Sequence, residues 1–112
     1  MNASKAIKIL SSLLTLKLYI VCILFMNAAD AGLTWYWVHN DIAEELNPIM
    51  DYALVTSPIL FFATKITLTS LGCYLLWRLR SVRFSKICAA ALVGIYLGIM
   101  VAHISIGWNI FF

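Results

Sequence analysis

The sequence predicts an all-α, polytopic membrane protein in which a short amphipathic helix precedes three transmembrane helices. Of the 112 residues, 63% are hydrophobic and only 12% are charged, and the mean hydropathy is +0.95. Soluble domains are far less apolar. Three apolar segments, residues 18–38, 52–77 and 87–108, are long enough to cross about 30 Å of hydrocarbon at about 1.5 Å per residue. They fill most of the chain, so no soluble catalytic domain remains.

The first 17 residues are predicted to form a separate element ahead of the transmembrane domain, residues 18–112. Lys5 and Lys8 share one arc of a helix with three hydroxyl residues, and Ile7 and Leu10 lie on the opposite arc. This pattern predicts a helix in the cytoplasmic membrane interface, with its lysines toward lipid headgroups. The alternative is that the segment extends the first span or packs on a partner.

The basic residues predict the orientation of the chain, because Lys and Arg near short loops stay on the cytoplasmic side. They precede the first span and fill the loop after the second, whereas the loop 39–51 carries only acidic charges. We therefore expect a multi-pass protein of the cytoplasmic (inner) membrane with a cytoplasmic N-terminus and an external C-terminus. The residues expected to contact lipid headgroups are Lys5, Lys8, Arg78, Arg80, Arg83 and Lys86.

Aromatic residues mark the ends of the predicted spans. Trp35, Tyr36 and Trp37 end the first span, Trp77 ends the second and Trp108 ends the third. Amphipathic rings prefer the membrane–water interface, so these positions agree with the predicted boundaries. The three cysteines lie inside the spans, which is typical of small buried hydrophobic residues, and they show no metal-binding or disulfide spacing.

Five polar residues inside the spans form a predicted polar core. Asn27, Asp30 and Thr34 are three and four residues apart, so they share one helix face. Asp30 and Lys65 lie near mid-depth, where an unpaired charge costs about 2.5–3.5 kcal/mol, and we expect them to pair. His103 lies in the third span at a depth near that of Asp30. The pair either only fixes helix register or belongs to a proton or ion site.

The external loop contains the segment "EELNP", which predicts a turn followed by a helix start. Pro48 suits the first turn of a helix, where its missing N–H costs nothing, and Asn47 can act as the cap. Glu44 or Glu45 could reach toward the N-terminus of that helix, where negative charge is favourable. The alternative is a ligand role for one of these carboxylates beside the polar core, but the spacing is too loose to predict a metal site.

Gly94 and Gly98 form one G-x-x-x-G pattern in the third span. Such spacing lets another helix approach closely, although the pattern is also common by chance in apolar helices. His103 lies well round the helix from these glycines. One face of the third helix can therefore meet the polar core while another meets a neighbour.

Taken together, these motifs resemble those of the domain of unknown function family 5658, which contains small prokaryotic membrane proteins with three helices. The first helix has N-x-x-D-x-x-x-T, the loop has E-x-N-P, and the second helix has a lysine and ends in "LLWRLR". His103, near the end of the third helix, also matches the family's pattern, and the resemblance covers about residues 18–103. The resemblance implies the architecture and a shared polar set, but no activity. The first 17 residues and the tail "SIGWNIFF" lie outside it.

Three classes of function compete. We expect a small non-catalytic membrane protein, either an accessory or structural subunit of a larger complex or a homo-oligomer, because three helices enclose little room for an aqueous path. The alternative is a proton or cation conducting or transport component that uses Asp30, Lys65 and His103. An intramembrane enzyme is the third class, but the sequence contains none of the usual metalloprotease, serine hydrolase or phosphate-loop motifs.

The same observations predict the partners. We expect membrane lipids, together with other membrane polypeptides or further copies of this chain, and no nucleic acid, because four basic residues in a tight membrane loop are a common topology signal. No cofactor is expected, although a bound lipid fits the apolar composition.

Overall fold

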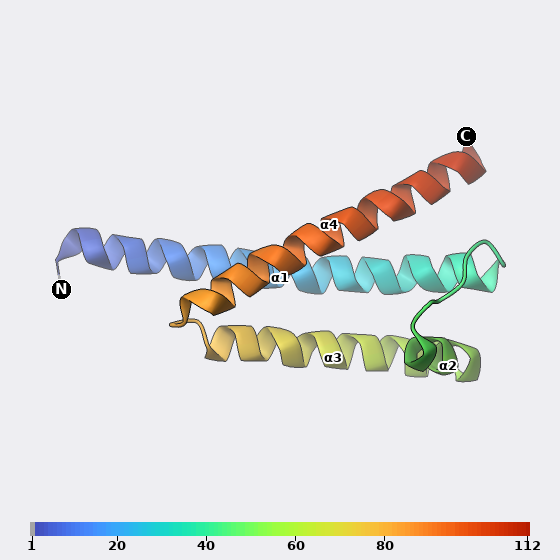
Figure 1. Cartoon of the computed structure of the whole chain (residues 1–112), viewed down its shortest axis with the longest axis horizontal. Coiled ribbons are helices and arrows are strands. Elements are labelled where there is room, and N and C mark those ends of the chain that lie inside the picture. The colour runs from blue at the N-terminus through green and yellow to red at the C-terminus, as the bar shows by residue number, and fades with distance from the viewer. Residues whose placement is uncertain (1) are drawn as a thin grey trace.

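The computed structural model describes residues 2–112, which contain four helices and no strand (Figure 1). The helices are α1 (Ala3–His39), α2 (Pro48–Thr56), α3 (Pro58–Arg78) and α4 (Arg83–Phe111). Three of them, α1, α3 and α4, are long and apolar enough to cross a membrane. The predicted fold class, an all-α chain with three membrane-spanning helices, is confirmed.

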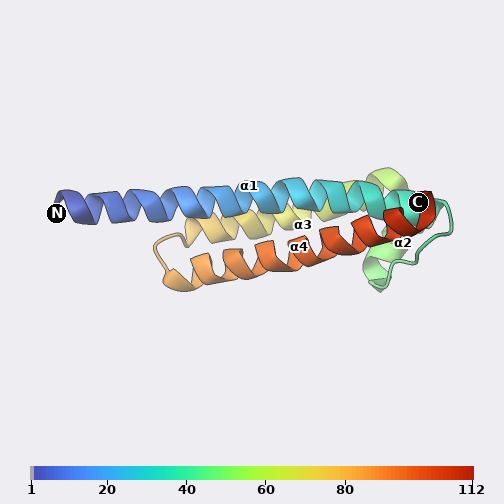
Figure 2. The ribbon, with the colours of Figure 1, turned by 90° about the horizontal axis from the view of Figure 1, so that it is seen from above.

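α1 is the helix against which α3 and α4 pack, and α2 packs mainly on α3. α1 contacts both α3 and α4, whereas α4 crosses α1 at an angle and diverges from α3 away from their connecting turn (Figures 1 and 2). We call the end that holds the loop 40–47 the acidic end, and the end that holds the α3–α4 turn the basic end. The two ends are separated along the longest dimension of the molecule, which is 58 Å.

α1 is one uninterrupted helix, which corrects the predicted division after Lys17. The Asn2 side chain accepts a hydrogen bond from the Lys5 N–H at 2.8 Å and caps its start. Residues 3–31 contain neither proline nor glycine, so nothing ends the helix at residue 17. Its 37 residues measure about 55 Å, more than the roughly 30 Å of a bilayer core. The placement of residues 3–17 in the membrane interface stays a prediction.

The predicted second span, residues 52–77, is divided at Pro58. α2 ends at Thr56, Ser57 is extended with φ −166° and ψ 132°, and α3 begins at Pro58. Proline has no N–H to donate, and its ring disfavours a helical conformation at the residue before it. The prediction that Pro58 lies within one continuous helix was therefore wrong. The third span, predicted over residues 87–108, is extended by about one turn at each end in α4.

α2 covers the acidic ends of α1 and α3. Met50, Ala53 and Leu54 of α2 form a buried cluster with Ala31 of α1 and Phe61 of α3. Ala31 directly follows the predicted core aspartate, and Phe61 lies one helical turn before the predicted core lysine. The cluster therefore sets the relative height of these two charged residues.

A buried side-chain hydrogen bond closes the turn between α3 and α4. Ser85 Oγ donates to the Leu76 carbonyl oxygen at 2.6 Å, and Ser85 is only 5% exposed. Leu76 lies in the last turn of α3, where carbonyl groups have no partner inside the helix. The N–H groups that follow α3 go to the carbonyls of Leu75 and Trp77. Ser85 thus donates to the Leu76 carbonyl, which receives no backbone N–H from the turn.

We predict that Ser85→Ala lowers the free energy of unfolding by about 1–2 kcal/mol, because the Leu76 carbonyl would lose its buried partner. Titration with a denaturing detergent, followed by circular dichroism, measures this change. Ser81→Ala removes an exposed hydroxyl from the same turn and should change the free energy by less than about 0.5 kcal/mol. Equal losses in the two variants would contradict the role given to Ser85.

Candidate functional site: a polar core between three helices

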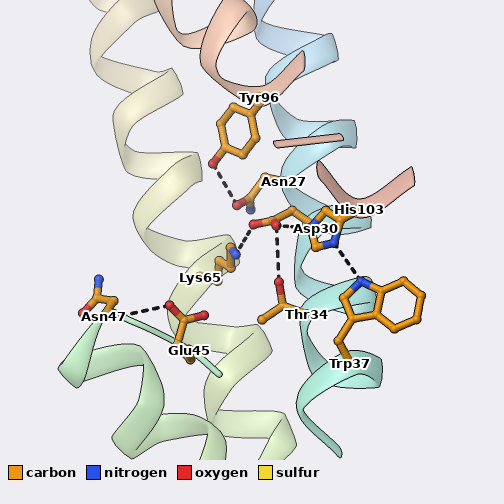
Figure 3. Close-up of polar contacts among 9 residues, drawn as sticks. All are labelled: Asn27, Asp30, Thr34, Trp37, Glu45, Asn47, Lys65, Tyr96 and His103. Atoms are coloured by element: carbon orange, nitrogen blue, oxygen red, sulfur yellow. Dashed lines mark hydrogen bonds and ion pairs between the residues drawn. The ribbon is translucent and has the colours of Figure 1, made fainter. Parts of the chain in front are cut away.

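Asp30 is the centre of the polar core and accepts hydrogen bonds from three side chains (Figure 3). One carboxylate oxygen pairs with Lys65 Nζ. The other receives His103 Nε2 at 2.7 Å and Thr34 Oγ1 at 3.3 Å. These donors come from α3, α4 and α1, respectively. A single buried carboxylate, in a residue 7% exposed, therefore joins all three long helices.

Lys65 has a second partner besides Asp30. Its Nζ lies 5.6 Å from the centre of the Phe61 ring, one turn earlier on α3, within the range of a cation–π interaction. Because removing one member of a buried ion pair leaves an uncompensated charge, each residue of this pair depends on the other. The lysine and the aspartate together contribute no net charge.

Trp37 and Asp30 together determine which nitrogen of His103 carries the proton. The indole Nε1 donates to His103 Nδ1 at 2.9 Å, and an indole N–H can only donate, so Nδ1 must be bare. The ring proton then lies on Nε2, which donates to Asp30. His103 is therefore neutral as long as both hydrogen bonds are present, and the core as a whole is neutral.

The position of Trp37 corrects a sequence prediction. Its ring was expected in the aromatic belt at the membrane surface, but Trp37 is only 4% exposed and packs against α4. A Cβ atom added at Gly107 would lie 3.7 Å from the Trp37 ring, at ordinary van der Waals distance, so the indole packs directly over this part of α4. One signal for this was in the sequence: Trp37 lies three residues after Thr34 and continues the spacing of the core residues.

A second contact joins α1 to α4 on the basic side of Asp30. The Tyr96 hydroxyl donates to Asn27 Oδ1 at 3.1 Å, and Asn27 is 1% exposed (Figure 3). Tyr96 was not among the residues predicted for the polar core. In the structure Lys65 and His103 both contact Asp30, and Tyr96 is the hydrogen-bond donor to Asn27.

A cavity of about 650 Å³ exposes the polar core toward the acidic end. Asp30, Lys65 and His103 lie on its surface, and the loop 40–47 borders its mouth. Asp30, Thr34, Trp37 and Val38 of α1 line its floor. The wall from α4 is mainly apolar and consists of Tyr96, Ile99, Ala102 and Ile106.

The external loop makes the contacts of a turn and cap. Asn47 Oδ1 accepts from the Ile49 N–H at 3.0 Å, and Pro48 is the first residue of α2. Glu45 Oε1 accepts from the Asn47 N–H at 3.1 Å. Glu44 and Glu45 also line the cavity. The loop therefore places two carboxylates at the mouth of the polar core while forming the start of α2.

The remaining predicted site residues lie on the surface. Gly94 and Gly98 are exposed, and a Cβ atom added at either would meet nothing within 4 Å, so this face of α4 is open to another helix. Its use by a partner stays a prediction. The predicted headgroup residues are in the first turns of α1 and around the α3–α4 turn, at Lys5, Lys8, Arg78, Arg80, Arg83 and Lys86.

Metal and thiol chemistry have no assembled site in the part of the chain that the structure describes. There, no three His, Cys, Asp or Glu side chains are placed to hold a metal ion. Cys22, Cys73 and Cys88 are free thiols on three different helices. The groups available in the core are a carboxylate, an ammonium and an imidazole.

We predict that His103 is held in the Nε2–H form in the folded protein at neutral pH. Nitrogen-15 NMR of histidine-labelled protein in nanodiscs distinguishes a protonated ring nitrogen from a bare one, and His39→Gln identifies the signals of His103. Trp37→Phe keeps an aromatic ring but removes the donor to Nδ1, and it should shift the Nδ1 signal while Nε2 stays protonated, because the Asp30 carboxylate still accepts from it. A protonated Nδ1 in the unaltered protein would exclude the Trp37 hydrogen bond.

Comparison with known proteins identifies a family. No curated protein and no solved structure shows significant similarity to the chain. A family model described as "Domain of unknown function (DUF5658)" matches residues 21–110. The matched region contains the whole polar core, including Trp37 and Tyr96, and the match confirms the predicted family. Because the match covers most of the chain, the protein belongs to the DUF5658 family.

Proposed function

We propose that the protein is a non-catalytic component of the membrane, acting as an accessory or structural subunit of a larger complex or as a homo-oligomer. In this proposal the polar core holds the three helices in one arrangement, and the cavity beside it receives a side chain of the partner. The observation that carries the proposal is a cavity with a polar floor between helices that are long and apolar enough to cross a membrane. We also propose that the basic end faces the cytoplasm.

The hydrogen bonding of the core supports a structural role. Within residues 2–112, no buried side-chain nitrogen or oxygen lacks a hydrogen-bond partner. A group that passes protons must exchange partners during each cycle, whereas here Asp30 has three donors and both ring nitrogens of His103 are bonded. Completely bonded polar networks make a packed arrangement rigid and unique.

The cavity supports a role in partnership. The Lys65 side chain remains 17% exposed and lies on the cavity surface together with Asp30 and His103. Polar groups that face hydrocarbon are costly, because lipid tails can neither donate nor accept hydrogen bonds. A polar side chain from a neighbouring helix would satisfy this surface and exclude lipid from it.

α4 is the surface on which such a neighbour would pack. It forms the apolar wall of the cavity, and its exposed Gly94 and Gly98 allow a second helix to approach its backbone closely. α4 packs mainly on α1 and meets α3 over a smaller contact. The proposed interface therefore consists of α4 together with the cavity mouth.

A second candidate function, proton or cation conduction, is favoured by the direction of the cavity. It connects Asp30 with the acidic end, and Glu44 and Glu45 at its mouth would concentrate cations there. A conducting protein would still need a path from Asp30 to the basic end. An oligomer could build that path between its subunits.

We predict that Asp30→Ala and Lys65→Ala each lower the free energy of unfolding by about 3–5 kcal/mol, because each leaves a buried charge without its partner. The double substitution should cost clearly less than the sum of the single ones, and the amount of protein assembled in the membrane should recover in part. Denaturing-detergent titration of the four proteins gives the coupling energy. Additive losses would show that the two residues do not stabilise the fold as a pair.

We predict that gentle extraction from the native membrane, followed by native mass spectrometry, recovers this chain with a fixed number of other polypeptides or of its own copies. The paired substitutions Gly94→Leu and Gly98→Leu should weaken that assembly by about tenfold, because they block close approach to α4. Gly72→Leu is the matched control, since Gly72 is exposed on α3 with open space around it.

Recovery of a monomer alone would contradict the subunit proposal. Proton or cation flux into vesicles that contain the purified protein would then test the second candidate. Flux that is lost in Asp30→Asn and reduced in Glu44→Gln would establish conduction, and absence of flux in the unaltered protein would exclude it.

A further inference from the structure

The basic end of the bundle has cations for which the chain supplies no counter-ion. The chain has eight Lys and Arg residues and five Asp and Glu residues, and Lys65 is the basic residue that lies in the polar core. The other seven basic residues lie in residues 5–17 and 78–86. The carboxylates lie in the core at Asp30 and in residues 41–51, toward the acidic end. The basic end must therefore obtain its anions from its surroundings.

Two of these cations gather on one aromatic ring. Lys17 Nζ of α1 lies 5.5 Å from the centre of the Trp77 ring, and the Arg80 guanidinium lies 4.9 Å from it. Arg80 is held there by a hydrogen bond from Nη1 to the Trp77 carbonyl oxygen at 3.1 Å. Two like charges near the same ring repel each other, so an anion bound between them would be favourable.

One hollow lies beside each of these two cations, and the two hollows differ in character. The first, of about 300 Å³, has a purely apolar lining beside Lys17 and Trp77, formed with Ile20, Val21, Cys73 and Tyr74. The second, of about 430 Å³, includes two hydroxyl groups and is lined by Ile9, Ser12, Leu13, Arg80 and Ser81. The polar hollow lies toward the end of the molecule, and the apolar hollow lies deeper along α1.

We infer that this end of the bundle binds one anionic phospholipid from the adjoining leaflet. Its phosphate lies between Lys17 and Arg80, the rest of its headgroup lies in the hollow that contains Ser12 and Ser81, and one acyl chain lies in the apolar groove beside Trp77. The order of the two hollows along α1 matches the order of headgroup and chain in a lipid. The general attraction of a basic surface for anionic lipids thus becomes a site of five named residues.

The apolar groove distinguishes a lipid from other anions. Inorganic phosphate or a nucleic acid would engage the cations but would leave the groove beside Tyr74 and Cys73 empty. A diacyl phospholipid fills both parts, and burial of its methylene groups adds to the electrostatic attraction. A zwitterionic lipid of the same chain length would fill the groove, but it would bring an added positive charge toward Lys17 and Arg80.

The test is native mass spectrometry of the purified full chain with added phosphatidylglycerol or phosphatidylcholine of equal chain length. We expect one phosphatidylglycerol to remain bound per chain at about tenfold lower lipid concentration than phosphatidylcholine. An excess of inorganic phosphate should not displace it. Equal retention of the two lipids, or displacement by phosphate, would overturn the proposal.

Two pairs of variants locate the site. Lys17→Gln with Arg80→Gln should weaken phosphatidylglycerol binding by about tenfold, whereas Lys8→Gln with Arg83→Gln removes the same charge from the same end and should weaken it by less than about twofold. Val21→Trp should also weaken binding without changing any charge, because it fills the groove. Its control is Leu18→Trp, at an exposed position of α1 outside the groove. Equal losses within either pair would show that the lipid has no defined site there.

Discussion

The structure depends on the need of one buried carboxylate for hydrogen-bond donors. Asp30 lies in the part of α1 nearer the acidic end, is 7% exposed, and belongs to a helix apolar enough to cross a membrane, where lipid tails cannot solvate it. α1 alone can offer only Thr34, four residues away, so the ammonium of Lys65 and the imidazole of His103 must come from α3 and α4. Apolar surfaces packed in lipid do not specify which helices meet or in what rotation, because lipid tails contact them equally well. The hydrogen bonds to Asp30 provide that specification.

The same interactions explain why the bundle is open on one side. α3 is held against α1 by the cluster around Phe61 and by Lys65, whereas α4 is held by His103, Tyr96 and the packing of Trp37 on Gly107. α3 and α4 are thus each fastened to α1 and meet each other mainly near their connecting turn, which Ser85 closes. The cavity beside Asp30 follows from this arrangement, since nothing draws the far half of α4 toward α3. Its floor is polar because it contains Asp30, to which both α3 and α4 are bonded, and its wall is apolar because it is formed by the side chains of α4.

The sequence allowed the fold class and most of the polar core to be predicted. Charged residues in apolar spans are few, and leaving one of them unpaired costs free energy, so they are expected to pair. Asn27, Asp30 and Thr34 share a face by simple helical spacing, and Lys65 was the one cation at matching depth. Trp37 was misplaced, since a tryptophan at a span end suits the membrane surface as well as a buried donor site, and only the position of α4 distinguishes them. The division at Pro58 was missed because hydropathy is continuous through residues 52–77 and gives no sign of a change in chain direction. The break after residue 17 was predicted from amphipathic character alone, yet a helix ends where its backbone is interrupted, and no residue there interrupts it.

The bonding of His103 limits how any proton could use the core. Its Nδ1 is occupied by an N–H that cannot accept, and its Nε2 already donates to Asp30, so a proton arriving through the cavity would find no free site on the ring. Protonation of His103 would require the Trp37 indole to leave a buried position against Gly107, and protonation of Asp30 would leave Lys65 with an uncompensated charge. Either event would loosen a contact that positions α3 or α4 against α1. In this fold a change of protonation in the core is therefore also a change in helix packing. The hydrogen bonding of the core thus suits a fixed scaffold better than a proton pathway.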